Sequence, residues 1–327
     1  MTRREWIGVL GALPAMAQFK PIKPTPPEAP EQEPTIKVEV ELVNLFCSVR
    51  DKRGSYVASL SKDDFEVLED GKPQTLKVFT RETDMPLTIG LLVDVSGSQE
   101  ALIEPERAAS IRFFQQVLRQ KDEAFIISFG VDSELLQDYT NSLSLLRRAL
   151  NSLRLNAGVA GPTPSTLPGS GRGTVLYEAV MLAADEKLKN EVGRKVMVVI
   201  TDGDDVGSRV KKEQAVEAAQ RADSIIYSVL YEDPRFHNPF YGGSGGNGAG
   251  VMQWMADQTG GHCFRVGRRD TLESIYDQIQ QEMRSQYVLG YTPTNSARDG
   301  SYRKLDIRLR DKNLKAVARK GYFASKG

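Results

Sequence analysis

The sequence predicts an α/β fold: a doubly wound, mostly parallel, Rossmann-like sheet inserted into a small all-β sandwich. Apolar strand-like runs alternate with helical patterns over residues 86–286, which is typical of a parallel sheet covered by helices on both faces. The flanking segments, 35–85 and 287–325, instead alternate with a period of two and contain no long helical pattern. Hydrophobic residues make up 40% of the chain and charged residues 26%, so a substantial core is expected.

Residues 1–17 have the three parts of an export signal. The Arg3-Arg4 pair gives a short basic start, an apolar run follows, and Ala15–Ala17 provides a small-x-small step. The apolar run is too short to span a bilayer. Thr2–Ile7 also resembles the twin-arginine signature, so we expect secretion to the periplasm or the cell exterior. The alternative is a frayed N-terminal helix with a chance arginine pair.

Residues 18–34 form a predicted proline-rich linker. Proline fixes φ and removes a backbone donor, so the segment is expected to be an extended spacer outside any core. No other stretch of the sequence is apolar for 18 residues, and we expect no membrane span in the mature chain.

The segments flanking the α/β region carry short predicted strands. A first strand spans Ile36–Val49, and the turn Asp70–Pro73 joins Phe65–Glu69 to Thr75–Phe79 in a predicted hairpin. Three further strands are expected near the C-terminus, at Tyr287–Tyr291, Tyr302–Leu309 and Leu314–Arg319.

Neither set of strands can form a stable unit by itself, because one face of so small a sheet stays uncovered. We therefore expect the N-terminal part (35–85) and the C-terminal part (287–325) to pair into one sandwich. An independent C-terminal β tail is the alternative.

Strands and helices alternate in the central region. Leu87–Val93 is almost continuously apolar, as expected of a strand buried on both faces. A helix is expected over 104–120, with Ala108, Ile111, Phe114, Val117 and Leu118 on its apolar face. The remaining expected strands are 124–129, 195–200, 224–231 and 262–266, and the helices are 143–153, 175–189, 211–222, 251–259 and 272–285.

Composition excludes several classes of function. Lys plus Arg and Asp plus Glu both number 43, and a protein that neutralises nucleic-acid phosphates would show a basic excess. Two cysteines and two histidines cannot supply a four-ligand zinc site of the usual kind. Cys47 and Cys263 are expected to be buried free thiols, with a disulfide as the alternative.

Five oxygen-bearing side chains lie where strands end or a helix begins. Asp94, Ser96 and Ser98 directly follow the Leu87–Val93 strand, Asp202 follows the strand at 195–200, and Thr174 precedes a helix. In an open α/β sheet, ligands bind at the carboxyl ends of the strands. Oxygen donors are the ligands that hard divalent cations prefer. The alternative is an ordinary set of polar turns and helix caps.

Together these residues resemble the von Willebrand factor A (VWFA) domain. Asp94-x-Ser96-x-Ser98, Thr174 and Asp202 match the three motifs of its metal-ion-dependent adhesion site (MIDAS), with no departure at any position. The similarity in element pattern extends over 86–285. The flanks Leu60–Gln74 and Tyr287–Pro293 resemble exported bacterial proteins described as VWFA-related.

The resemblance implies a magnesium site, with Mn²⁺ or Ca²⁺ as alternative metals, held by the five residues of the motif. It implies a metal-dependent protein-binding or cell-adhesion module whose cation contacts an Asp or Glu carboxylate of a protein partner. It does not imply an enzyme. The alternatives are a metal-assisted hydrolase using the same site, for which only Asp204 and Asp205 lie near as bases, and a structural domain with a vestigial site.

Overall fold

The computed structural model describes residues 42–81, 85–156, 173–231 and 247–326. Contacts divide the chain into Met1–Glu39 and a compact unit, Val40–Gly327. The predicted export signal and the whole of the predicted proline-rich linker fall in the first part, and both lie outside the described residues. Among those residues, no helix combines the length and apolar character needed to cross a membrane.

The structure describes strands along the whole of this unit, from three to eight residues long. They are β1 (Val43–Arg50), β2 (Phe65–Glu69), β3 (Lys72–Gln74), β4 (Leu76–Arg81), β5 (Leu87–Asp94), β6 (Glu123–Phe129), β7 (Ser133–Thr140), β8 (Arg194–Thr201), β9 (Ser224–Leu230), β10 (Cys263–Arg265), β11 (Tyr287–Tyr291), β12 (Tyr302–Leu309), β13 (Lys315–Val317) and β14 (Gly321–Phe323).

The described α-helices all lie between β5 and β11, and a short 3-10 turn, η1 (Lys62–Asp64), precedes β2. The helices are α1 (Ile103–Val117), α2 (Leu143–Asn151), α3 (Leu176–Leu182), α4 (Lys212–Arg221), α5 (Gly248–Thr259) and α6 (Leu272–Arg284), with a short 3-10 turn η2 (Gly97–Gln99) and a π-helical turn η3 (Ala183–Leu188) that continues α3.

Six strands form the central sheet in the order β10-β9-β8-β5-β6-β7. All neighbouring pairs are parallel except β6 with β7, which is antiparallel. The strand order reverses direction around β5, the arrangement of a doubly wound sheet. The predicted fold class is thus confirmed, although the edge strand β7 was not predicted.

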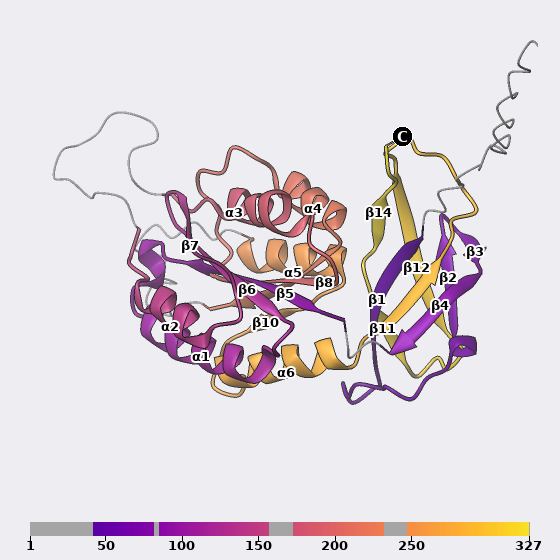
Figure 1. Ribbon diagram of the computed structural model, residues 1–327, viewed down its shortest axis with the longest axis horizontal. Coiled ribbons are helices and arrows are strands. Elements are labelled where there is room, and N and C mark those ends of the chain that lie inside the picture. The colour runs from indigo at the N-terminus through magenta and orange to yellow at the C-terminus, as the bar shows by residue number, and fades with distance from the viewer. Residues whose placement is uncertain (1–41, 82–84, 157–172, 232–246, 327) are drawn as a thin grey trace, which may run out of the picture. The chain divides into compact units, whose positions relative to one another are not determined.

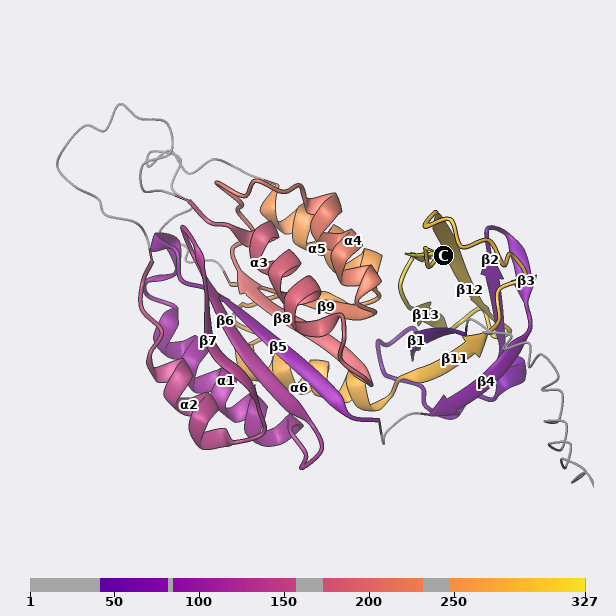
Figure 2. The same ribbon diagram turned by 45° about the horizontal axis from the view of Figure 1, so that its top comes forward.

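Helices cover both faces of this sheet (Figures 1 and 2), with α1, α2 and α6 on one face and α3, α4 and α5 on the other. Along β5, Leu91 and Val93 pack into the first layer and Leu92 into the second. Because successive side chains of a strand point to opposite faces, a strand covered on both sides must be apolar throughout.

The central strand is also shaped by Gly90. A Cβ atom there would lie 2.4 Å from the ring of Phe125 on the neighbouring strand β6. Glycine at this position leaves the space that the Phe125 ring occupies.

The buried face of α1 differs from the predicted one. Ala108 is exposed and Ile111 only half-buried. The helix is rotated so that the face packed on the sheet consists of Ile103, Glu106, Ala109, Ser110, Phe113, Phe114 and Val117. The apolar spacing predicted the helix but not which of its faces is buried, because apolar residues of α1 lie on several overlapping faces.

Two antiparallel sheets form the β part, in the orders β13-β1-β11-β4 and β14-β12-β2-β3. Each sheet combines N-terminal and C-terminal strands. In the first sheet β1 pairs with β11 and β13, and in the second β2 pairs with β12. The predicted pairing of the two ends of the chain is confirmed, and the alternative of an independent C-terminal tail is wrong.

The predicted hairpin is wrong in its partner strand. The tight turn at Asp70 and Gly71, both with positive φ, joins β2 to the short strand β3. The chain then enters the other sheet, where β4 pairs with β11. Because the turn contains only two residues, the residues that directly follow it, Lys72–Gln74, are the ones that pair with β2.

One buried carboxylate joins α6 to the β part. Glu282 is fully buried and accepts hydrogen bonds from Ser48 Oγ at 2.7 Å, Arg50 Nη2 at 2.9 Å and Tyr56 OH at 2.9 Å. Arg50 supplies the compensating charge. A buried carboxylate with this many donors is satisfied in place and holds the end of α6 against β1.

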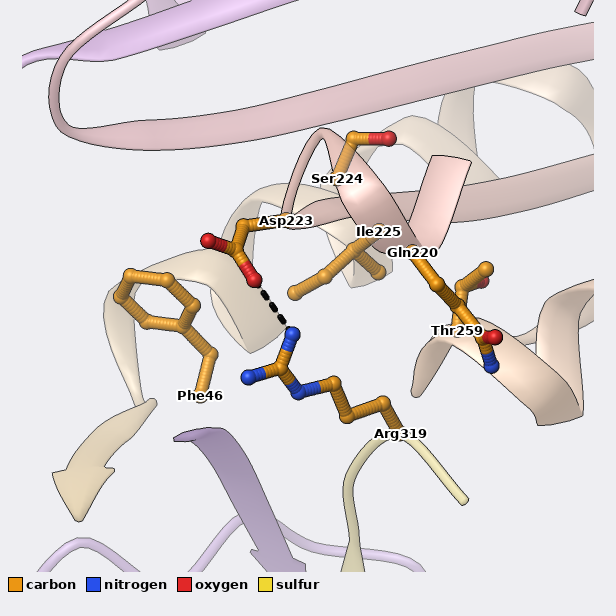
Figure 3. Close-up of a pocket in the computed structure, with 7 residues that line it drawn as sticks. All are labelled: Phe46, Gln220, Asp223, Ser224, Ile225, Thr259 and Arg319. Carbon is orange, nitrogen blue, oxygen red and sulfur yellow. Dashed lines mark hydrogen bonds and ion pairs between the residues drawn. The ribbon is translucent and has the colours of Figure 1, made fainter. Parts of the chain in front are cut away.

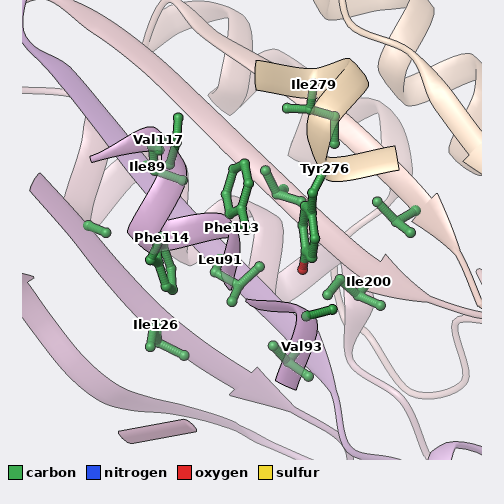
Figure 4. Close-up of a cluster of buried hydrophobic side chains, with 14 of the residues drawn as sticks. Ile89, Leu91, Val93, Phe113, Phe114, Val117, Ile126, Ile200, Tyr276 and Ile279 are labelled. Atoms are coloured by element: carbon green, nitrogen blue, oxygen red, sulfur yellow. The ribbon is translucent and has the colours of Figure 1, made fainter. Parts of the chain in front are cut away.

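Phe113 is central to the packing between α1 and α6 (Figure 4). Its ring stacks on Tyr276 with centroids 4.4 Å apart, and both side chains are 1% exposed. We expect Phe113→Ala to lower the free energy of unfolding by about 3–5 kcal/mol, because it removes a fully buried ring and leaves a cavity. Urea denaturation measures the change.

The control is Leu145→Ala on α2, where the side chain is 36% exposed and the expected loss is under about 1 kcal/mol. Equal losses in the two variants would contradict this assignment of the core.

Candidate functional site

The candidate site lies where β5 and β8 end. These strands are parallel neighbours, with Val93 opposite Ile200, so Asp94 and Thr201 come next to each other at the carboxyl edge of the sheet. Thr201 Oγ1 donates a hydrogen bond of 2.6 Å to Asp94 Oδ2. Asp94 is fully buried, and its carboxylate is therefore held from one side by the neighbouring strand.

The two serines lie in the turn that follows Asp94. The backbone N–H of Ser96 donates to Asp94 Oδ1 at 2.9 Å, which fixes the second carboxylate oxygen. Ser96 precedes the 3-10 turn η2, which contains Ser98, and the two hydroxyl oxygens lie 3.1 Å apart. Both serine hydroxyls thus face the same point, as the alternating motif predicts.

Asp202 reaches the same point from the end of β8. Its Oδ2 accepts a 2.5 Å hydrogen bond from Ser98 Oγ, and its Oδ1 accepts one from the Asp204 N–H at 3.1 Å. Gly203 makes this turn possible: its φ is +88°, and a Cβ there would lie 2.7 Å from the backbone of Gly248. The loop is consequently packed against the start of α5.

Thr174 lies beside the same loop through its backbone. Its N–H and C=O both bond to Val206, at 2.9 and 3.0 Å, and the residue is 7% exposed. The structure therefore brings Asp94, Ser96, Ser98 and Asp202 together through side-chain contacts. It places Thr174 against the loop that carries Asp202, and among the described residues its hydrogen bonds go to Val206.

Asp205 has a structural role in this loop. Its Oδ1 accepts from the backbone N–H of Tyr177 at 3.2 Å, near the start of α3, and from Ser208 Oγ at 2.6 Å. Burial raises the pKa of Asp205. These bonds make it a cap for α3, in agreement with the polar-turn interpretation of the sequence.

The site has an excess of negative charge. Burial, followed by repulsion from Asp202, raises the pKa of Asp94 to about 7 despite the hydrogen bonds from Ser96 and Thr201. Neither carboxylate forms an ion pair with any Lys or Arg that the structure describes. A cation at this edge would relieve that repulsion.

The donor set fits a hard divalent cation. Two carboxylates and two hydroxyls converge here, and Mg²⁺ binds oxygen ligands from a few protein groups while keeping several waters. Within the described ranges, no group of three or more His, Cys, Asp or Glu side chains could hold a metal ion. A metal site at this edge would therefore depend on the serine and threonine hydroxyls.

Sequence reasoning missed three residues around Asp94. Thr201 was not among the predicted site residues, and its contact with Asp94 follows from the strand register. Gln99 and Glu106 are 0% and 1% exposed, and within the described part of the chain none of their side-chain N or O atoms has a hydrogen-bond partner. Burial, followed by the charge on Asp94, raises the pKa of Glu106 well above its usual value. The sequence signal that could have identified Glu106 is a charged residue among the apolar residues on one face of α1.

Two pockets lie away from these residues. One, of about 10 Å³, has room for roughly one water molecule and is bordered by the ion pair of Arg319 with Asp223 (Figure 3). The other is an open hollow of about 410 Å³ beside Lys62 and Arg310. Neither contains a residue of the predicted site.

Cys47 is buried and Cys263 half-buried, and no disulfide joins them. The predicted burial is thus found for Cys47 but only in part for Cys263. Burial raises the pKa of the Cys47 thiol to about 12, so this group is inert near neutral pH.

The sequence matches no family model and no curated protein. Solved structures give similarities at low identity. An aerotolerance-related membrane protein from Bacteroides fragilis NCTC 9343, carrying multiple mutations to serine, is 17% identical with a TM-score of 0.43, covering 60% of this chain and 98% of its own. BatB from Bacteroides thetaiotaomicron is 21% identical with a TM-score of 0.42, covering 60% and 97%.

The vWF domain of the type V pili tip protein Mfa5 from Porphyromonas gingivalis is 11% identical with a TM-score of 0.45, covering 62% of this chain and 96% of its own. At such identities and scores, function has to be argued from the site itself.

The raised pKa of Asp94 predicts a pH dependence of the metal-free protein. The pKa of this carboxyl is about 7 in the folded state against 3.8 ordinarily, so between these values the folded state binds more protons than the unfolded state. Its contribution to stability is therefore favourable at pH 4 and is lost as the pH rises to 7.

The free energy of unfolding of the wild type should fall between pH 4 and pH 7, as Asp94 loses its proton. We expect Asp94→Asn to make that fall smaller by roughly 2–4 kcal/mol. Denaturant unfolding in the presence of chelator, at several pH values, measures it. An identical pH profile in the wild type and the variant would contradict the assignment.

Proposed function

We propose that this protein is an exported, metal-dependent protein-binding module of adhesion type. The observation that carries the proposal is the convergence of Asp94 and Asp202 at one sheet edge, where the Ser98 hydroxyl bonds to Asp202 and neither carboxylate has a described cationic partner. Asp94 is fully buried, and two uncompensated carboxylates in such a setting are costly unless a cation is bound between them.

Asp94, Ser96, Ser98 and Asp202 would hold the cation, with Thr174 as the fifth ligand of the proposed set. Mg²⁺ is the proposed metal, and Mn²⁺ or Ca²⁺ could replace it. When bound, the cation would supply an electrophilic contact for an Asp or Glu carboxylate of a protein partner, because neutral hydroxyl donors leave much of its charge uncompensated.

Hydrogen bonds within the protein preorganise this site. Thr201 and the Ser96 N–H bind the two oxygens of Asp94, so the carboxylate needs no rearrangement. Asp205 ties its loop to the start of α3, close to the Thr174–Val206 backbone pairing. Preorganised donors of this kind reduce the cost of binding an ion or a partner.

The proposal assigns the protein no catalytic activity. A hydrolase at this edge would require a general base within hydrogen-bond reach of a water. Asp205 already accepts hydrogen bonds from the Tyr177 N–H and the Ser208 hydroxyl. His262 bonds to the Gly261 carbonyl and lies 3.7 Å from Glu282. These contacts favour binding over hydrolysis.

Metal binding is the first test of the proposal. We expect Mn²⁺ or Mg²⁺ to raise the melting temperature of the chelator-treated full chain, by the equivalent of about 3 kcal/mol at a hundredfold excess over Kd. Asp94→Ala should abolish the increase, since it removes the most deeply placed ligand. Differential scanning calorimetry with direct Mn²⁺ titration provides the measurement.

Asp257→Asn is the matched control, because it removes an exposed carboxylate on α5 and should leave the metal response intact. A wild type that fails to bind Mn²⁺ by direct titration, or an Asp94→Ala variant that binds it equally well, would overturn the proposed site.

Carboxylate recognition needs a separate experiment. Immobilised peptides carrying one Asp or Glu, compared with their Asn or Gln counterparts, should retain the protein only in the presence of divalent cation. Retention of the protein by the Asn or Gln peptides, or retention in the presence of chelator, would contradict a cation-centred contact.

A further inference from the structure

Two exposed aliphatic side chains lie on loops next to the candidate site. Val206 is 52% exposed and Leu155 is 40% exposed. Single apolar residues at a surface are common and need no explanation. These two differ in that backbone hydrogen bonds hold the chain at or beside each of them against segments of the candidate site.

Val206 is held next to Thr174. Its N–H donates to the Thr174 carbonyl at 3.0 Å, and its carbonyl accepts from the Thr174 N–H at 2.9 Å. Gly173 permits this pairing, because a Cβ atom there would lie 2.5 Å from the Val206 carbonyl oxygen. Asp205, which precedes Val206, is bonded to the start of α3. The Val206 side chain is therefore exposed on a backbone that is fixed beside a proposed ligand.

Leu155 is held next to the loop of Asp94. The residue that follows it, Asn156, donates its backbone N–H to the Val95 carbonyl at 2.8 Å. Val95 directly follows Asp94 in the sequence, and its own N–H bonds to the Phe129 carbonyl of β6 at 2.8 Å. Leu155 is thus one residue away from a hydrogen bond to the loop that carries the two serines.

Val131 links these two positions. Its N–H donates to the Asn156 carbonyl at 3.3 Å, and its Cγ1 would be 4.0 Å from a Cβ atom on Gly173. Gly173 lies against the Val206 carbonyl, and Val131 is itself half-buried. The segments that carry Leu155, Val131 and Val206 are therefore neighbours beside the site.

The charged side chains on these loops favour a partner with few acidic groups. Glu100 is exposed directly after the serine turn, and no described Lys or Arg forms an ion pair with it. Asp132 is also exposed, and the Arg154 guanidinium donates to backbone carbonyls at the end of α2. A divalent cation would offset Asp94 and Asp202 and leave the outer carboxylates to repel a second acidic group.

Resting on the proposed function, we propose that the partner segment presents one Asp or Glu between apolar side chains, and that Val206 and Leu155 contact those side chains. The cation would bind the carboxylate, and the two aliphatic side chains would set the preference for its neighbours. Burial of apolar surface is favourable, and a fixed backbone reduces the ordering that binding requires. The two residues would determine specificity without ligating the metal.

The test compares two immobilised peptides that each carry one glutamate, flanked by leucines in one peptide and by serines in the other. With Mn²⁺ present, the full chain should bind the leucine-flanked peptide about tenfold more tightly. Val206→Ala and Leu155→Ala should each weaken binding of that peptide by about fivefold, because each removes apolar contact area. Neither variant should change the Mn²⁺ affinity, measured by electron paramagnetic resonance.

Val192→Ala is the matched control. Val192 is 83% exposed and precedes β8, so it lies at the edge of the sheet opposite to the candidate site. The control should bind both peptides and Mn²⁺ as the wild type does. Circular dichroism checks that each variant is folded.

The outcomes separate the two proposals. If the wild type binds Mn²⁺ and the glutamate peptides but treats leucine and serine flanks alike, or if both variants keep the full preference, this inference alone fails. A leucine preference that persists with chelator, or with glutamine in place of the glutamate, reports general apolar adhesion and also overturns it. If the wild type does not bind Mn²⁺, the proposed function fails and this inference fails with it.

Discussion

The parallel pairing of β5 with β8 is the constraint on which the rest of the molecule depends. It puts Asp94 and Thr201 side by side and brings Asp202 to the same edge. Both strands are buried along their whole length, so their register is held by side-chain packing on two faces. A shift of one residue would turn each strand's buried side chains toward the opposite helix layer.

Charge at that edge follows from the same pairing. Two carboxylates that belong to different strands are forced close together, and burial denies them the solvent that would weaken their repulsion. The hydroxyls of Ser98 and Thr201 relieve only part of it. No described Lys or Arg forms an ion pair with either carboxylate, whereas the buried Glu282 and Glu69 have arginine partners and the buried Asp122 accepts two backbone N–H bonds.

Glu282 and Glu69 show that contrast. Glu282 has Arg50, and Glu69 has Arg303 together with the hydroxyls of Tyr291 and Tyr322. Each of these carboxylates stabilises a junction of the fold: the end of α6 on β1, and the interior of the sandwich. The chain thus supplies partners to its structural carboxylates, and leaves unpartnered those at the edge where we propose that a cation binds.

The sequence by itself determined the fold class, the order of most elements and the residues of the candidate site. These follow from local signals: the continuous apolar run of β5, the period-two strands at both ends, and the spacing of Asp94, Ser96 and Ser98. Such signals depend on neighbours a few residues away, which a single sequence displays directly.

Only the tertiary structure decided which strand pairs with which and which way a helix faces. It assigned β4 to the sheet of β11, added β7 and β14, and turned α1 so that Glu106 is buried and Ala108 exposed. It also paired the backbone of Thr174 with Val206. The physical reason is that pairing and burial are set by packing between segments distant in sequence, and local periodicity carries no record of those partners.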